Sequence, residues 1–174
     1  MKITVVNRQR TKKINVRLLK KIVSGMLLEM NITAAELGIN LLAAREMTLV
    51  NETFLHHEGS TDVITFDYHD GGPASRLSHS KCSKDGGRCD AGPTLHGELF
   101  ISVDDAVAQA KKFKTNWRSE VVRYVAHGVL HLLGHDDLKP ELRRKMKRAE
   151  NRLVRRLEKG FSLAQLSPAG KINA

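Results

Sequence analysis

The chain has 174 residues, 41% of them apolar, which is enough for one domain that buries its own core without a disulfide framework. It has no run of ~20 apolar residues that could cross a bilayer, and its start lacks the apolar segment of a signal peptide, so we expect a soluble, cytoplasmic protein with no membrane partner. The net charge of +10 is concentrated in residues 1–21 and 139–159. Such clustering fits a polyanion partner and a merely solvated basic surface equally well.

The first third of the chain predicts two strands, each followed by a helix. Residues 2–6 alternate in polarity and are rich in β-branched side chains, which favours a strand. Asn15 is a suitable N-cap for a helix that ends near residue 30 and carries its apolar side chains on one face. Gly38 precedes an apolar strand over residues 39–44, and residues 46–55 have the pattern of a short helix.

Two further strands flank a long polar segment. Residues 61–68, TDVITFDY, give a strong strand signal, and residues 96–103, HGELFISV, give another. Residues 70–93 predict a disordered insertion, because they are polar and too long for an ordinary connection. The two cysteines, Cys82 and Cys89, lie in this segment. Their spacing is wider than that of a usual zinc knuckle, so we expect free thiols.

The last third predicts three helices. Asp104 is placed to cap a helix that ends near residue 113, and residues 117–133 form a second helix with an apolar face. Residues 140–159 form a third helix, whose buried stripe is predicted to be Leu142, Met146, Ala149, Leu153 and Leu157.

The order of these elements predicts an α+β fold. We expect a single domain over residues 1–160, with a small mixed sheet of about four strands packed with helices. Residues 161–174 are expected to form a C-terminal tail.

The residues most typical of an active site lie in the segment HGVLHLLGHDD, residues 127–137. His127 and His131 are four apart and so share one face of the predicted helix, a spacing that suits two neighbouring positions on a tetrahedral metal ion. Gly134 allows a left-handed turn that ends the helix and folds the chain back. We therefore predict one zinc ion per chain, held at the end of this helix.

The third protein ligand is Asp137 or His135. Asp137 follows the glycine by three residues and carboxylate oxygen binds zinc well, whereas His135 has the commoner ligand type but lies one residue past the turn. We favour Asp137. Three protein ligands leave a fourth position for water, as catalytic zinc sites require, whereas a further ligand from His135 would close the site and make the metal structural.

The same segment closely resembles the HGxLHLxGxDH signature of the YbeY family of bacterial endoribonucleases. Residues 61–66, TDVITF, look like the family's T-[DN]-V-L-S-F strand, and residues 96–102, HGELFIS, look like its G-D-I-x-I-S strand. The resemblance covers most of the chain, with three motifs in the family's order. It implies a small α+β domain with zinc in a cleft lined by basic residues. The implied function is a single-strand-specific, metal-dependent endoribonuclease that acts in ribosomal RNA maturation, at the 3′ end of small-subunit rRNA, and in ribosome quality control.

Two departures from the family pattern bear on the site. The third histidine of the signature falls on Asp137, and a related His-His-Asp set occurs in some metzincin-like proteases. The family also tends to carry an arginine shortly before the TDV strand, thought to help hold RNA. That position is Leu55 here, and His56, His57 or a basic residue elsewhere would have to take its place.

RNA cleavage also needs proton transfer and a means of holding the phosphates. His135, next to the ligand turn, and Glu98, on the HGELFIS strand, are our candidate catalytic residues for proton transfer. For Glu98, a solvent-facing strand position is the simpler interpretation. The candidates for RNA binding are Arg143, Arg144 and Lys147, all in the basic last helix.

Two other functions are compatible with these motifs. A zinc peptidase of the metzincin type would use the same pair of helical histidines, but Gly128 stands where HExxH proteases keep their general-base glutamate. A non-catalytic ribosome-binding factor would use the metal only structurally. The endoribonuclease, with single-stranded ribosomal RNA and the small ribosomal subunit as partners, is the function that we predict.

Overall fold

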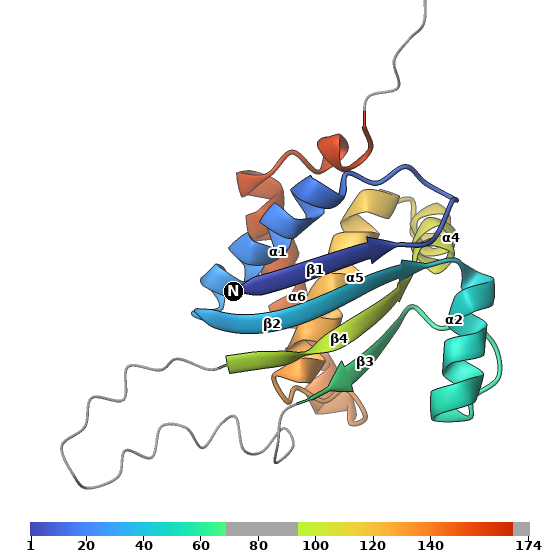
Figure 1. The fold of residues 1–174 in the computed structure, drawn as a ribbon. Helices are drawn as coiled ribbons and strands as arrows, with labels where there is room; N and C mark the ends of the chain where they lie inside the picture. Colours follow the sequence, from blue (N-terminus) through green and yellow to red (C-terminus); the bar gives the residue numbers. More distant parts are fainter. Residues whose placement is uncertain (69–93, 169–174) are drawn as a thin grey trace, which may run out of the picture.

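A four-stranded mixed sheet forms one side of the molecule in the computed structural model, which describes residues 1–68 and 94–168 (Figure 1). The strands are β1 (Lys2–Asn7), β2 (Ala34–Leu42), β3 (Val63–Asp67) and β4 (Thr94–Ser102). Their order in the sheet is β1-β2-β4-β3, with β1, β2 and β4 parallel and β3 antiparallel to β4. The predicted insertion over residues 70–93, with both cysteines, lies outside the described residues.

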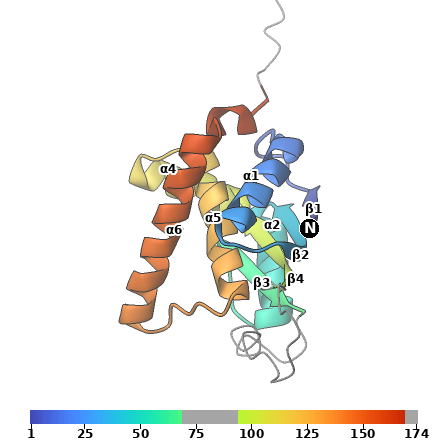
Figure 2. The same cartoon turned by 90° about the vertical axis from the view of Figure 1, so that its left-hand side faces the viewer.

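Helices cover one face of this sheet in two tiers. Figure 2 shows α5 (Trp117–Leu132) between the sheet and α6 (Pro140–Gly160), with α1 (Val16–Glu29) beside α5. Three shorter elements are α2 (Ala44–Val50), its π-helical continuation η1 (Asn51–Leu55) and α4 (Val103–Phe113). The chain ends its described part with the 3-10 helix η2 (Leu163–Leu166). The predicted α+β class is confirmed, and none of the described helices is long and apolar enough to span a membrane.

The alternation of side chains along β4 decides which residues face the helices. Leu95, Leu99 and Ile101 are buried in the core that α1 and α5 share with the sheet. The residues between them, His96, Glu98 and Phe100, therefore point to the opposite face of the sheet, where they are half-buried or exposed. This alternation matters for function because it separates Glu98 from every side chain on α5.

Of the two predicted helix caps, the structure confirms one. The side chains of Asn15 and Asn116 accept hydrogen bonds from first-turn amides and begin α1 and α5. The prediction that Asp104 caps α4 is wrong, because Ser102 is the N-cap and accepts from the first turn. The Asp104 carboxylate instead accepts a hydrogen bond from the Ala44 amide at 2.7 Å, which ties α4 to the start of α2.

The second strand also differs from its prediction. β2 begins at Ala34 and ends at Leu42, so Gly38 lies inside the strand instead of preceding it. A Cβ at Gly38 would lie 2.7 Å from Cγ of Glu98, which is its partner on β4. The glycine therefore marks the place where the Glu98 side chain lies over the neighbouring strand.

Gly97 sets how closely α5 approaches the sheet. A Cβ there would lie 2.5 Å from the carbonyl oxygen of Phe66 and 2.9 Å from Cδ2 of Leu132, at the end of α5. The carbonyl belongs to the paired strand β3 and has little freedom to move. The absent side chain at Gly97 thus lets the C-terminal end of α5 lie directly against β3 and β4.

We predict that Gly97→Ala lowers the free energy of unfolding by about 1–3 kcal/mol, the usual cost of overpacking a core. Urea unfolding followed by circular dichroism measures this. Gly160→Ala is the matched control, because nothing lies within 4 Å of a Cβ at Gly160 and that variant should be as stable as the parent protein or slightly more so. Equal stability of the two variants would contradict the assigned role of Gly97.

Candidate metal centre

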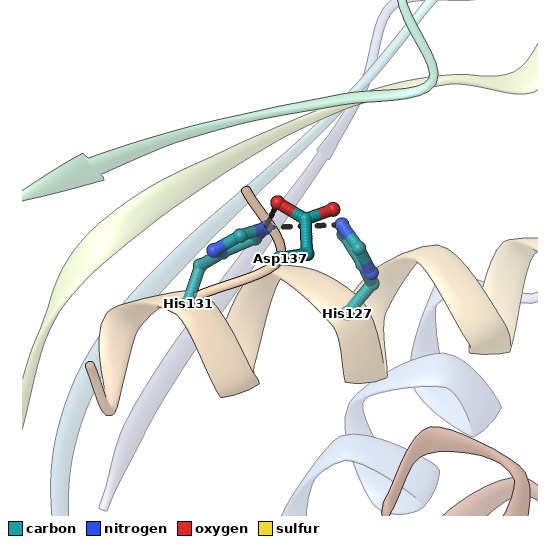
Figure 3. Close-up of side chains that lie close together, drawn as sticks. All are labelled: His127, His131 and Asp137. Atoms are coloured by element: carbon teal, nitrogen blue, oxygen red, sulfur yellow. Dashed lines mark hydrogen bonds and ion pairs between the residues drawn. The ribbon is translucent and has the colours of Figure 1, made fainter. Parts of the chain in front are cut away.

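The end of α5 is shaped by a glycine turn that reverses the chain. Gly134 has a φ of +85°, and its amide donates to the carbonyl of His131 at 2.8 Å. The next amide, of His135, donates to the carbonyl of Leu130 at 3.0 Å. This pair of bonds is a Schellman motif, which satisfies the last carbonyls of the helix. The following residues return along α5, and Asp137 reaches the face that carries the two histidines (Figure 3).

His127, His131 and Asp137 form a half-buried group whose potential ligand atoms all lie within 4.8 Å of one another. The Nε2 atoms of the two histidines are 3.1 Å apart, and Nε2 of His131 is 4.0 Å from Oδ1 of Asp137. Two ligands at ~2.0–2.1 Å from a tetrahedral zinc ion would be about 3.4 Å apart. The donor types and their spacing therefore fit a metal ion, as the sequence predicted for the two histidines.

The hydrogen bonds of the two Nδ1 atoms show which nitrogens are available to a metal. Nδ1 of His131 donates to the carbonyl oxygen of His135 at 3.0 Å, and Nδ1 of His127 donates to the Glu150 carboxylate at 3.3 Å. A carbonyl and a carboxylate can only accept, so both Nδ1 atoms carry the proton. In the neutral rings both Nε2 atoms then hold lone pairs. These lone pairs face each other, and a metal ion that both of them bind would relieve their mutual repulsion.

Glu150 anchors His127 through a buried network of charges. This glutamate is 5% exposed and accepts from Arg123 at 2.6 Å as well as from His127. Arg123 also donates to the Asn151 side chain at 2.6 Å and lies 3.5 Å from Glu120. The arginine thus fixes the glutamate that orients the histidine, and it couples α6 to the metal group on α5.

The electrostatic environment differs between the two histidines. Burial lowers the pKa of His127, but the hydrogen bond and charge of Glu150, helped by Asp62 and Asp137, raise it on balance. Burial, together with the neighbouring His127, lowers the pKa of His131, and Asp137 offsets only part of this. Burial raises the pKa of Glu150, yet the hydrogen bonds from His127 and Arg123 lower it overall, so the network holds a carboxylate.

A cavity of about 400 Å³ opens beside the metal group, between α4, α5 and α6. His127 and Asp137 form part of its wall. Its buried lining consists of Glu120, Tyr124, Met146 and Glu150. Its more exposed lining includes Phe113, Arg143 and Lys147. A substrate group in the cavity would therefore be in contact with the candidate ligands on one side and with cations on the other.

The predicted RNA-binding residues divide between the cavity and the open surface. Arg143 and Lys147 line the cavity, and Nε of Arg143 donates to the backbone carbonyl of Asp137 at 3.1 Å. Arg144 is exposed on the same helix but is not among the lining residues. Leu55, at the end of η1, and the two histidines that follow it do not line the cavity either.

The structure does not bring the two candidates for proton transfer to the metal group. The His135 side chain is exposed and lines a separate cavity with Glu29 and Arg152, and only its carbonyl contacts His131. Glu98 lies on the face of the sheet opposite α5, where the Tyr68 hydroxyl donates to it at 3.4 Å. The turn at Gly134 and the alternation of β4 are the physical reasons for these two positions.

Three residues of the site were not identified from the sequence. Glu150 occupies the buried face of α6, between Met146 and Leu153, where a charged residue signals a buried partner. Arg123 supplies that partner from α5. Asp62, from the TDV motif, lines the cavity and acts on the pKa of His127. Glu150 and Arg123, like Asp62 and His127, are too far apart in the sequence for a local pattern to reveal their interaction.

The family model and the related sequences agree on one family, and a solved structure shares the fold. The family model described as Endoribonuclease YbeY matches residues 2–158. A protein named Endoribonuclease YbeY from Chlorobium phaeovibrioides is 33% identical over 144 residues, which covers 83% of this chain and 83% of that protein. One of the same name from Myxococcus xanthus is 33% identical over 138 residues, 79% of this chain and 42% of that protein. A solution structure of a Thermotoga maritima protein shares the fold, with a TM-score of 0.63 and 19% identity over 97% of this chain and 99% of that one.

We predict that Glu150→Gln weakens the affinity for zinc about 10- to 100-fold, the usual effect of losing a carboxylate behind a ligating histidine. Glutamine keeps the shape and one acceptor oxygen, which can still accept from Arg123. It loses the charge and presents an NH2 group, which cannot accept, in place of the second oxygen that accepts from His127. Competition with a chromophoric chelator measures the affinity. Glu158→Gln is the control on the same helix, since Glu158 is exposed and its one hydrogen bond within the described residues is with Ser119. Two variants with unchanged zinc affinity would show that Glu150 does not support the site.

Proposed function

The chain belongs to the endoribonuclease YbeY family, and from this membership we propose that it cleaves single-stranded RNA at His127, His131 and Asp137, with one zinc ion as cofactor. Its substrate would be ribosomal RNA, in maturation at the 3′ end of small-subunit rRNA and in ribosome quality control. Its partner would be the small ribosomal subunit in the cytoplasm. The observation that carries the proposal is the set of three ligating side chains beside a cavity edged by Arg143 and Lys147.

Different residues of the site would bind the metal, orient the two imidazoles and bind the phosphates. A zinc ion held by this set would act as a Lewis acid and lower the pKa of water for attack on a phosphodiester. Glu150 and the His135 carbonyl hold the two imidazoles in the tautomer that presents Nε2. The guanidinium of Arg143 and the ammonium of Lys147 would bind the phosphates on either side of the cleaved bond. We assign proton transfer to neither His135 nor Glu98, because neither lines the cavity.

The geometry around Gly128 disfavours the peptidase alternative. A Cβ at this position would lie 2.7 Å from Cδ2 of Leu99 and 3.3 Å from Cγ2 of Thr65, both on the sheet. A glutamate general base at this position of α5 would therefore collide with β4 and β3. The segment that resembles HExxH has no room for the residue on which peptide hydrolysis by that motif depends.

We expect Asp137→Ala to lose both its zinc and its cleavage of a single-stranded RNA, whereas wild type holds one zinc per chain. Elemental analysis and a gel-based cleavage assay measure the two properties. Asp136→Ala is the control, because among the residues that the structure describes its carboxylate accepts only from the Leu138 amide, and it stands outside the metal group. Zinc retained by Asp137→Ala would move the third ligand to another side chain. Metal-free wild type that still cuts RNA would overturn the role of the metal.

Lys147→Ala should weaken RNA binding in a salt-dependent manner, since this ammonium would neutralise a phosphate at the cavity edge. The slope of log affinity against log salt should fall by about 0.7 for one lost phosphate contact on a single strand. Fluorescence anisotropy of a labelled RNA at several salt concentrations measures the slope. Lys159→Ala, in the exposed last turn of the same helix, should leave the slope at its wild-type value. The assignment of Lys147 fails if both variants change the slope equally.

A further inference from the structure

The wall of the cavity on α4 carries an aromatic ring that phosphate binding does not explain. Phe113, the last residue of α4, is 61% exposed and lines the same cavity as His127 and Asp137. The Lys112 ammonium lies 5.4 Å from the centre of its ring. An exposed phenylalanine elsewhere needs no explanation, but here it lines a cavity that continues to His127 and Asp137 and that also holds Arg143 and Lys147.

Gln109 adds hydrogen-bonding capacity next to this ring. It lies four residues before Phe113, so both side chains lie on one face of α4, and both line the cavity. Gln109 is half-buried, and its amide makes no hydrogen bond within residues 1–68 and 94–168. The amide offers both a donor and an acceptor. An aromatic face beside a free amide is the combination with which proteins hold unstacked nucleobases.

We propose that Gln109 and Phe113 form a nucleobase subsite, which takes one base of the RNA out of its stack while the adjoining phosphate lies at His127, Asp137 and Lys147. The inference rests on the proposed function and names the part of the substrate that this wall recognises. The cavity volume of about 400 Å³ lies within the ~300–1,000 Å³ of ordinary ligand sites. A base without a partner strand turns into the cavity without the free-energy cost of unpairing that a base in a duplex has, so the subsite also supplies a physical reason for preferring single strands.

The protein side of the test compares Phe113→Ala, Phe113→Trp and Phe54→Ala. Phe54 is also 61% exposed, but it packs edge-on against Phe66 and does not line the cavity, so it is the matched control. Binding of a labelled single-stranded RNA is measured by anisotropy with metal-free protein, and cleavage of the same RNA with zinc-loaded protein. Phe113→Ala should weaken binding about 5- to 150-fold, the range for a lost base–aromatic stack. Phe113→Trp and Phe54→Ala should bind as wild type does.

The RNA side of the test removes bases instead of the ring. A series of RNAs, each abasic at one position around the mapped cleavage site, is bound to wild type and to Phe113→Ala. At one position the abasic RNA should bind wild type at least as weakly as intact RNA binds Phe113→Ala, because it loses the contact with Gln109 as well. There the two changes together should cost less than the product of their separate losses. Losses that multiply at every position, or an abasic series with no effect, would overturn the subsite.

The two proposals fail in different ways. If wild type cleaves intact RNA, but Phe113→Ala binds RNA as Phe54→Ala does and every abasic RNA binds as intact RNA does, the subsite is wrong. The proposed function is then unaffected. Zinc-loaded wild type that cleaves no single-stranded RNA removes the proposed function, and the subsite falls with it. Circular dichroism of each variant ensures that a loss of binding is not a loss of fold.

Discussion

The reversal of the chain at Gly134 is the constraint on which the site depends. Had α5 continued, Asp137 would lie six residues beyond His131, about 9 Å further along the axis and on another face. The left-handed glycine and its two hydrogen bonds instead bring the carboxylate back to the two imidazoles. The same turn places the His135 carbonyl where it fixes the tautomer of His131. One backbone conformation therefore determines both the third ligand and the orientation of the second.

The buried charges between α5 and α6 form the second requirement of the site. Glu150, Arg123 and His127 are mutually satisfied, and an unpaired charge among them would be costly in so buried a place. Because Glu150 comes from α6, this helix must pack correctly for His127 to be held. The same helix carries Arg143 and Lys147 to the cavity. The side of α6 that lines the cavity thus supplies both the support of the metal group and cations for a polyanion.

Sequence patterns predicted what depends on neighbours along the chain. The i, i+4 spacing of His127 and His131, the glycine turn after them and the cap Asn15 are local, and each is present in the structure. The errors and omissions arose where distant segments meet. Gly38 predicted the start of a strand, although it lies inside one. The Glu98 side chain that explains the glycine comes from 60 residues further along the chain, so no local pattern reveals it.

Competing local signals account for the remaining differences. Ser102 and Asp104 are both good capping residues, and only the contact of Asp104 with α2 decides between them. Glu98 was considered for chemistry by its type, but the alternation of β4 turns it away from α5. No local pattern in the sequence singles out Phe113 and Gln109, because they come together only in a cavity built by three helices.

The aspartate at residue 137, where the resembled signature has a histidine, gives that cavity a further role. A carboxylate cancels one of the two charges of a divalent ion, which a third neutral imidazole would leave intact. The site of this chain would then attract a phosphate less strongly by its metal alone, and the cations of Arg143 and Lys147 beside it would supply more of the attraction than in a relative with three histidines.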